Sequence, residues 1–389
     1  MSLTLRTMSA TGYRSLRAIR FPVDRLTVFV GANGVGKTNL YRALQLVQAA
    51  ATGALSRELA AEGGMESAYW AGDRKGKGPV RITMNVGFAT EDSDRAAYGY
   101  EVSAGVAHSY ELGIGVRIPT AAAFLLEPQV KEESLAFHDG RRAVKLLERR
   151  GPSVIARDEA GVRQELGTEL MASETALGSI EDPARFPDLH LVRSTLRDWR
   201  FYHELRADAA SALRQPCLAV TSPTLSSDGD NLAAVFATLV HIREDTADLD
   251  RAVADAFPGA KLEVPSPGRT ASFGVRFPEF PARVFQAGEL SDGTLRYLAL
   301  AGALLAYRLP ALVVLNEPET SLHPDLLDPL ARMIVRAAER TQVLLVTHSE
   351  RLADALAEHG GIKPRTVVKR GSETWIEGLR NVGEFAEED

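Results

Sequence analysis

Cysteine is almost absent from this chain. Its 389 residues include one cysteine, Cys217, so no intramolecular disulfide can form. A long apolar run is also missing, because the longest candidate, residues 297–315, is interrupted by Arg308 and Pro310 and falls short of a span of ~20 residues. Residues 1–6 have no uninterrupted apolar core of a secretory signal. We therefore expect a cytoplasmic protein in a reducing compartment, with no membrane association.

The chain also lacks an excess of positive charge and any long-range repeat. A formal net charge of -6 argues against a generally basic surface that coats nucleic acid. We find no repeat period, sustained heptads or low-complexity tract, which excludes a long coiled-coil arm. Apolar residues make up 45% of the chain, enough for a sizeable core. The length predicts one large domain with an insertion, or two lobes.

A complete phosphate-binding motif is present near the amino terminus. Residues 31–38, Gly-Ala-Asn-Gly-Val-Gly-Lys-Thr, fit G-x-x-x-x-G-K-[ST] and lie between the apolar run 26–30 and a helical pattern at 39–51. The glycines let backbone N–H groups surround an anion, and the helix adds its positive dipole end. We predict that Lys37 reaches the β- and γ-phosphates of a nucleotide and that the Thr38 hydroxyl holds Mg²⁺. The other predicted nucleotide contacts are Asn33, Gly34, Val35, Gly36 and Asn39.

The residue patterns in the first half of the chain predict strands, and those that follow predict helices. Alternation over residues 3–30 and β-like runs at 80–86, 98–102 and 123–126 favour an antiparallel sheet, with a surface loop at 62–79. Residues 139–185 are polar and weakly periodic, which favours a mobile or inserted segment. Helical patterns dominate 187–257, and a proline-rich joint follows at 258–281.

The last part of the chain alternates helices and strands. We predict helices at 294–307, 324–340 and 351–359 and strands at 311–315 and 342–346, hence a parallel sheet that also includes strand 26–30. The predicted fold class is therefore α/β: a P-loop NTPase with a mainly parallel sheet flanked by helices, an antiparallel β lobe and an inserted helical lobe. The predicted domains are an ATPase lobe over 1–137, a mainly helical lobe over 138–284 and a second ATPase lobe over 285–389.

Polar residues end both strands of this last block. Asn316 and Glu317 follow an apolar run and lie at the carboxyl edge, where ligands bind in open α/β sheets. A carboxylate there can orient and deprotonate an attacking water, so Glu317 is the candidate general base. Glu319 is the alternative base, but it follows the proline, so we expect it to lie out of reach of the water. His348 ends the next strand, at a position suited to contact a γ-phosphate.

A short polar motif begins the first helix of the block. In Leu290-Ser291-Asp292-Gly293-Thr294, the serine or the aspartate is placed as an N-cap, and an ordinary cap is the alternative interpretation. Together with the other motifs, it makes residues 1–50 and 285–350 resemble the ABC-type ATPase head of the RecF and SMC group and of OLD-type ATPases. The sequence Asn-Glu-Pro-Glu-Thr-Ser-Leu-His-Pro at 316–324 is similar to a group of predicted AAA-family ATPases.

The resemblance implies a shared ATP site. It assigns Walker A to 31–38, a signature loop to 290–294, Walker B to 312–317, a D-loop to 321–323 and the switch histidine to His348. In that family two heads enclose two ATP molecules, so the implied partner is a second copy in an ATP-dependent homodimer. Walker A of one chain and Ser291 and Gly293 of the other would hold each ATP. Hydrolysis would release the heads.

The resemblance also implies a further contact residue and the cellular processes that the protein would serve. Arg14, in the segment before the P-loop strand, matches a family position where a basic residue approaches nucleotide or DNA. The implied processes are DNA repair, DNA maintenance or phage defence, with DNA and a separate effector subunit as further possible partners.

Two positions depart from the family pattern. Asn316 stands where the family has an Mg²⁺-binding aspartate; with Thr38 it makes the predicted metal site, and its neutral amide predicts weaker metal binding and slow hydrolysis. Asp292 stands where glycine is usual and would add negative charge beside a phosphate site.

Three other functions stay open. One is a nucleotide-gated scaffold with little turnover, which Asn316 favours. Another is a transporter-type nucleotide-binding subunit, which the long separation of Lys37 and Ser291 disfavours. The third is a nuclease, for which residues 350–389 offer no acidic metal-binding cluster.

Overall fold

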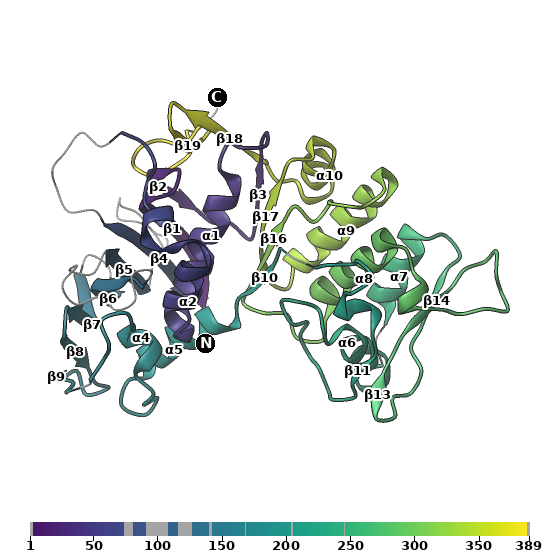
Figure 1. Cartoon of the computed structure of the whole chain (residues 1–389), viewed down its shortest axis with the longest axis horizontal. Coiled ribbons are helices and arrows are strands. Elements are labelled where there is room, and N and C mark those ends of the chain that lie inside the picture. Colours follow the sequence, from purple (N-terminus) through teal and green to yellow (C-terminus); the bar gives the residue numbers. More distant parts are fainter. Residues whose placement is uncertain are drawn as a thin grey trace. The chain divides into compact units, whose positions relative to one another are not determined.

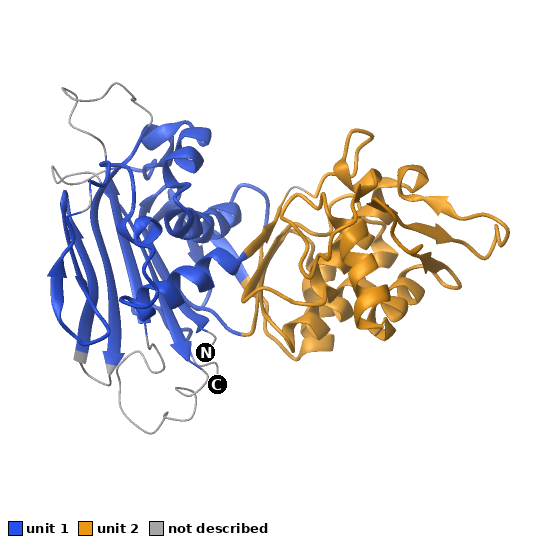
Figure 2. Cartoon of the chain, turned by 90° about the horizontal axis from the view of Figure 1, so that it is seen from below, with its two compact units in different colours: residues 1–24, 32–199, 366–389 blue, residues 25–31, 200–365 orange. Residues whose placement is uncertain are grey.

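The computed structural model describes residues 3–73, 81–90, 108–115, 127–139, 142–167, 169–203, 205–244 and 246–386. The chain divides into two compact units (Figures 1 and 2). Unit 1 consists of residues 1–24, 32–199 and 366–389, and unit 2 consists of residues 25–31 and 200–365. The chain therefore passes between the units after residues 24, 31, 199 and 365, and the second passage falls inside the P-loop motif.

Unit 1 is built on an antiparallel sheet with the strand order β2-β1-β4-β5-β6-β7-β8-β9. Along β1, buried side chains such as Met8 and Ala10 alternate with less buried ones, so one face of the strand supplies the core. The pairs Ala10 with Ile19 of β2 and Met8 with Val86 of β4 fix the register. The strands are β1 (Leu3–Tyr13), β2 (Leu16–Pro22), β4 (Ile82–Thr90), β5 (His108–Gly115), β6 (Gln129–Asp139), β7 (Arg142–Arg150), β8 (Ser153–Arg157) and β9 (Arg163–Glu165).

Helices cover one face of this sheet (Figure 2). They are α1 (Lys37–Thr52), α2 (Leu55–Ala61), α3 (Gly64–Ala68), α4 (Ala176–Ser179) and α5 (Pro187–Asp198). The helix after the P-loop, α1, packs against β1, β4 and α5 through the apolar stripe that its sequence predicts: Leu40, Leu44 and Val47 are buried. An antiparallel hairpin of β18 (Arg365–Arg370) and β19 (Glu373–Ile376) follows near the end of the chain.

Unit 2 contains a parallel sheet with the order β10-β16-β17-β3. Its strands are β10 (Arg200–Tyr202), β16 (Leu312–Asn316), β17 (Gln342–Thr347) and β3 (Leu26–Val30). Figure 1 shows β3, in purple, beside β17, in yellow-green, although the two are far apart in the sequence. The apolar residues of β16 and β17 are fully buried, as expected for parallel strands covered on both faces.

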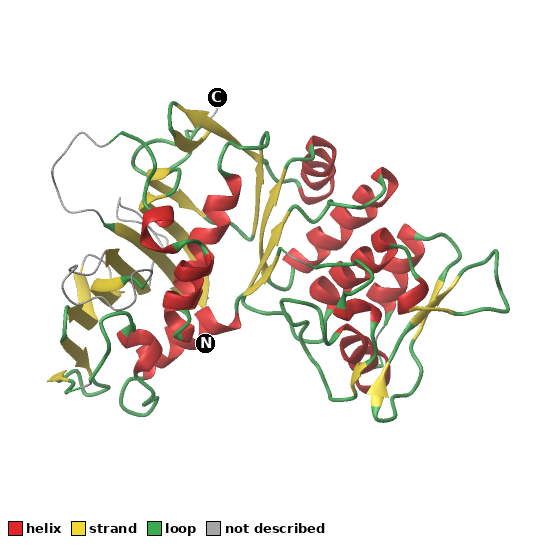
Figure 3. Cartoon of the chain, viewed as in Figure 1, coloured by secondary structure: helices red, strands yellow, loops and turns green. Residues whose placement is uncertain are grey.

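Helices dominate the rest of unit 2 (Figure 3). The longest, α8 (Asp292–Leu305), packs against α6, α7 and α9 around one apolar core. These helices are α6 (Leu232–Thr238), α7 (Ala247–Ala256), α9 (Leu327–Ala338) and α10 (Glu350–Gly360), with a π-helical turn at Leu239–Arg243 and 3-10 turns at Ala212–Arg214, Ala287–Glu289 and Pro324–Leu326. Short strands make two small sheets: β11 (Cys217–Leu218) with β13 (Thr270–Ala271), and β12 (Lys261–Glu263), β14 (Gly274–Arg276) and β15 (Phe285–Gln286).

The last part of the chain agrees with the sequence prediction, and the middle does not. Residues 142–165, expected in a mobile or inserted segment and in a mainly helical lobe, form β7, β8 and β9 of the antiparallel sheet. Charges on these strands conceal their alternation: Glu148 forms ion pairs with Lys145, Arg150 and Arg163. The two compact units also cut across the three predicted domains.

Other local predictions differ in detail. Within the predicted loop 62–79, residues 64–68 form α3, and the predicted proline-rich joint contains β12, β13 and β14. The first predicted β-like run corresponds to β4, whereas the runs at 98–102 and 123–126 lie outside the described residues. In the part of the chain that the structure describes, no helix has both the length and the apolar character to cross a membrane.

Arg25 fastens the first strand of the parallel sheet to the end of α9. Its Nε donates to the carbonyl of Ala338 at 2.7 Å and its Nη2 to that of Glu339 at 2.6 Å. The Arg25 carbonyl in turn accepts a hydrogen bond from Val343 of β17, at 2.9 Å. A cation at the carboxyl end of a helix also interacts favourably with the helix dipole.

Replacement of Arg25 by methionine should therefore lower the free energy of unfolding by about 1 kcal/mol. Urea denaturation followed by circular dichroism measures the change. The control is Arg269→Met, because the exposed Arg269 side chain has no hydrogen bond or ion pair among the described residues. Equal stability of the two variants would contradict this role for Arg25.

Candidate nucleotide-binding site

The P-loop has the backbone geometry that an anion cradle needs. Gly34 and Gly36 have positive φ angles of 81° and 96°, and Gly36 immediately precedes α1. Lys37 is only 4% exposed, and its ammonium donates to the carbonyl of Ala32 at 2.8 Å. The lysine side chain therefore links the two ends of the loop by a hydrogen bond. Asn33 and Thr38 are exposed, so their side chains are accessible to a ligand.

Arg14 lies in the turn between β1 and β2, where its backbone adopts a φ of 48°. Its guanidinium lies 2.9 Å from the Glu62 carboxylate, which also accepts a hydrogen bond from the Tyr13 hydroxyl and lies 3.4 Å from Arg42. Two guanidinium groups thus share one carboxylate, and the cluster keeps a net positive charge. A nucleotide-contacting role for Arg14 stays a prediction.

The predicted site residues Asn316, Glu317 and His348 lie at the carboxyl edge of the parallel sheet in unit 2. Val30 of β3 is opposite Thr347 of β17, and Val346 of β17 is opposite Asn316 of β16. Parallel strands end at the same edge, so Gly31, Asn316, Glu317 and His348 all leave the sheet there. The Asn316 side-chain oxygen is buried and has no hydrogen-bond partner among the described residues.

Glu317 has an unusual backbone conformation that its surroundings support. Its φ of 48° lies in the left-handed region, which is uncommon for glutamate. Its N–H donates to Val346 at 2.7 Å, and its carbonyl accepts hydrogen bonds from Thr320 and from the guanidinium of Arg296. Burial lowers the pKa of Arg296, and the charge of Glu319 opposes that shift. The Glu317 side chain remains 33% exposed, accessible to a water molecule.

The structure places the Glu319 side chain at the sheet edge, beside His348. Its side chain, 6% exposed, accepts hydrogen bonds from the Thr347 hydroxyl and from the His348 N–H, the latter at 3.1 Å. It also lies 3.2 Å from His348 Nδ1, nearer than Glu317 at 3.6 Å. Two successive turns follow the strand: the Thr320 N–H donates to the Glu317 carbonyl, and the Leu322 N–H donates to the Glu319 carbonyl. The chain thereby turns back, and the Glu319 side chain reaches the sheet edge despite the intervening proline.

The predicted signature loop caps α8. The Ser291 hydroxyl accepts a hydrogen bond from the Thr294 N–H at 3.2 Å, which fits the N-cap interpretation. A side chain on Gly293 would have its Cβ 2.9 Å from the Ser321 carbonyl oxygen, so this glycine permits the D-loop to approach closely. The two loops line a hollow of about 680 Å³ with contributions from Ser291, Gly293, Thr294 and residues 321–326.

The charge of Asp292 is compensated within unit 2. Its carboxylate pairs with Arg214, whose side chain is 10% exposed. The same guanidinium donates to the carbonyls of Leu290, at 2.8 Å, and Gly288, at 3.1 Å. Arg214 thus offsets the negative charge expected at this loop and fixes the loop's backbone. Nothing in the sequence around Arg214 identified it.

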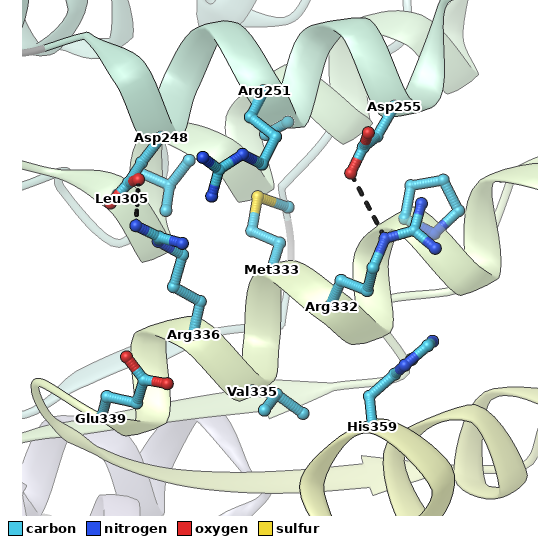
Figure 4. Close-up of a pocket in the computed structure, with 12 residues that line it drawn as sticks. Asp248, Arg251, Asp255, Leu305, Arg332, Met333, Val335, Arg336, Glu339 and His359 are labelled. Atoms are coloured by element: carbon cyan, nitrogen blue, oxygen red, sulfur yellow. Dashed lines mark hydrogen bonds and ion pairs between the residues drawn. The ribbon is translucent and has the colours of Figure 1, made fainter.

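A separate hollow of about 290 Å³ lies between α7, α9 and α10 and contains none of the predicted site residues (Figure 4). Two of its three arginines have acidic partners: Arg332 pairs with Asp255 and Asp328, and Arg336 pairs with Asp248. Its three arginines are matched by the carboxylates of Asp248, Asp255 and Glu339 in the same lining, which makes this hollow a poorer phosphate site than the P-loop.

Comparison with known proteins identifies the family and the fold. A family model described as "AAA domain, putative AbiEii toxin, Type IV TA system" matches residues 26–354. The matched region includes the whole P-loop, the signature loop and the sheet edge at which Asn316 and Glu317 lie. No protein of curated function matches the chain.

Two solved SMC head structures are similar over almost the whole chain. The first, an Smc head bound to the C-winged helix domain of ScpA, has 15% identity and a TM-score of 0.54, covering 96% of this chain and 97% of that chain. The second, an Smc head domain with an extended coiled coil bound to the C-terminal domain of ScpA, derived from Pyrococcus furiosus, has 12% identity, a TM-score of 0.53 and 96% coverage of both chains. The predicted ABC-type head fold is confirmed.

The contacts of the two carboxylates predict different effects on stability. Glu319→Gln should lower the free energy of unfolding by about 1–2 kcal/mol, because a buried acceptor of two hydrogen bonds becomes partly a donor. Glu317→Gln should change it by less than about 0.5 kcal/mol, since that side chain is more exposed. Chemical denaturation without nucleotide makes the comparison, and equal losses would count against the structural role of Glu319.

Proposed function

Because this chain belongs to the AAA-domain family described as "AAA domain, putative AbiEii toxin, Type IV TA system", we propose that it is an ATP-driven switch that hydrolyses ATP. The observation that carries the proposal is the register of β3, β17 and β16. The strand that leads into the P-loop ends at the same sheet edge as Asn316, Glu317 and His348. Gly31, the first residue of the P-loop, therefore leaves the sheet at the same edge as the candidate base.

Each predicted residue has a role in this reaction. The loop N–H groups of residues 33–39 and the Lys37 ammonium bind the phosphates. Glu317 accepts a proton from water as the water oxygen bonds to the γ-phosphorus, and the bond between that phosphorus and the bridging oxygen breaks to leave ADP. His348, whose Nδ1 is oriented by Glu319, contacts the γ-phosphate through its other nitrogen. Arg14 adds positive charge.

The residues also fit a magnesium ion. A buried oxygen of Asn316 without a hydrogen-bond partner among the described residues is a suitable ligand, and the exposed Thr38 hydroxyl is the second. Asn316 and Thr38 would hold the ion, which would offset the negative charge of the ATP phosphates. Asn316 supplies a neutral amide oxygen rather than a carboxylate, so we propose that the metal is held less tightly and that turnover is slow.

The proposed partner is a second copy of the chain. The signature loop and the D-loop line a common hollow, with the Ser291 hydroxyl and the start of α8 beside it. A helix N-terminus suits the γ-phosphate of an ATP held by another head. The similarity to SMC heads in fold supports this ATP-dependent homodimer.

The process that the switch serves is proposed from the family description. It names a putative toxin of a Type IV TA system, which favours phage defence with a separate partner subunit over DNA repair or maintenance. DNA binding receives no support from the overall charge of -6.

Glu317→Gln should stabilise the dimer. Without the base, ATP stays intact between the two heads, so the variant should be dimeric with ATP and Mg²⁺ and monomeric with ADP. Light scattering after size-exclusion chromatography measures the mass in each state. Ser291→Arg in the same background should prevent the dimer by filling the hollow. A monomer in every nucleotide state would contradict the proposal.

Asn316→Asp should lower the Mg²⁺ concentration for half-maximal phosphate release about tenfold, because a carboxylate binds the ion more strongly than an amide. Asn381→Asp adds the same charge at an exposed position and should have no effect. An unchanged Mg²⁺ requirement in Asn316→Asp would argue against Asn316 as a ligand. If the wild type binds ATP but releases no phosphate, the nucleotide-gated scaffold is the better description.

A further inference from the structure

The carboxyl-terminal hairpin contacts the P-loop through one buried hydroxyl. Thr374, in β19, is 1% exposed, and its Oγ1 donates to the carbonyl of Val35 at 2.7 Å. The backbone N–H of Thr374 donates to the carbonyl of Ser15 at 2.8 Å. The hairpin thus connects Ser15, in the β1–β2 turn, to Val35, in the P-loop. All of these residues belong to unit 1.

These contacts form a continuous series of hydrogen bonds in which each hydroxyl accepts one bond and donates the next. Thr374 Oγ1 lies 2.6 Å from Ser15 Oγ, which accepts a hydrogen bond from Asn39 Nδ2 at 2.6 Å. The Thr374 hydroxyl has one proton and uses it on Val35, so the Ser15 hydroxyl must donate to Thr374. The sequence of donors therefore runs from Asn39 through Ser15 and Thr374 to Val35. It starts on the first turn of α1 and ends within the P-loop.

Gly36 explains how closely the hairpin approaches. A Cβ at this position would lie 1.9 Å from Thr374 Oγ1 and 2.5 Å from Ser15 Oγ. Its positive φ of 96° also disfavours a side chain. Gly36, the second fixed glycine of the motif, thus leaves room for the hydroxyl groups of Thr374 and Ser15.

We propose that Thr374 is a positioning residue for ATP binding: its hydroxyl fixes the Val35–Gly36 turn so that the loop N–H groups are oriented before the phosphates arrive. Preorganised donors bind an anion more tightly because less order must be imposed on binding. The inference rests on the proposed function of the P-loop, but it concerns binding alone and does not require hydrolysis.

The test is Thr374→Val, which keeps the shape of the side chain and removes its hydroxyl. The dissociation constant for ATP, measured by calorimetry with the full-length chain well below its unfolding temperature, should rise about five- to tenfold, corresponding to about 1 kcal/mol. Thr374→Ser should restore binding to within about twofold. The control is Thr366→Val, because Thr366 is an exposed threonine on β18 with no side-chain hydrogen bond among the described residues.

Unchanged ATP affinity in Thr374→Val would overturn the proposal even if that variant unfolds at a lower temperature, since a merely structural residue would affect stability alone. If Thr374→Val does not fold, Ser15→Ala removes the preceding donor and should weaken ATP binding about two- to threefold; unchanged affinity there would overturn the proposal equally. Absence of ATP binding by the wild type would instead contradict the proposed function of the P-loop.

Discussion

Parallel pairing of three strands far apart in the sequence is the constraint on which the molecule depends. β3 joins β17, β17 joins β16, and all three run in the same direction. The pairing is held by side chains buried on both faces, each worth about 1.5–3 kcal/mol when removed from water. Because closing a longer loop adds little entropy cost, the chain accommodates most of unit 1 and most of unit 2 between the first strand and the last two.

Two departures from the family pattern have different structural outcomes. The charge of Asp292 is matched by Arg214, which also fastens neighbouring carbonyl groups. At Asn316, by contrast, the amide oxygen is left without a hydrogen-bond partner among the described residues. One departure is therefore compensated locally by an ion pair, whereas the other leaves a polar atom for a ligand to satisfy.

Much of the fold followed from the sequence, and the differences have identifiable causes. The alternation of helices and strands after Asp292 was readable because each element has a strong apolar period. β7 was missed because ion pairs on its exposed face hide the alternation. Within the candidate site, local motifs identified the P-loop and Glu317, but the contacts of Glu319 and Arg214 depend on turns and on tertiary pairing that no local pattern encodes.

Thr374 also sets the order in which the site can be completed during protein synthesis. The ribosome makes the P-loop first, but the threonine that contacts it is added about 340 residues later, which at about 5–20 residues per second is a delay of roughly 15 to 70 seconds. In the nascent chain, the Val35 carbonyl of the P-loop therefore lacks the hydrogen bond from Thr374. Full affinity for nucleotide would arise only after the hairpin has been synthesised and has closed against Val35.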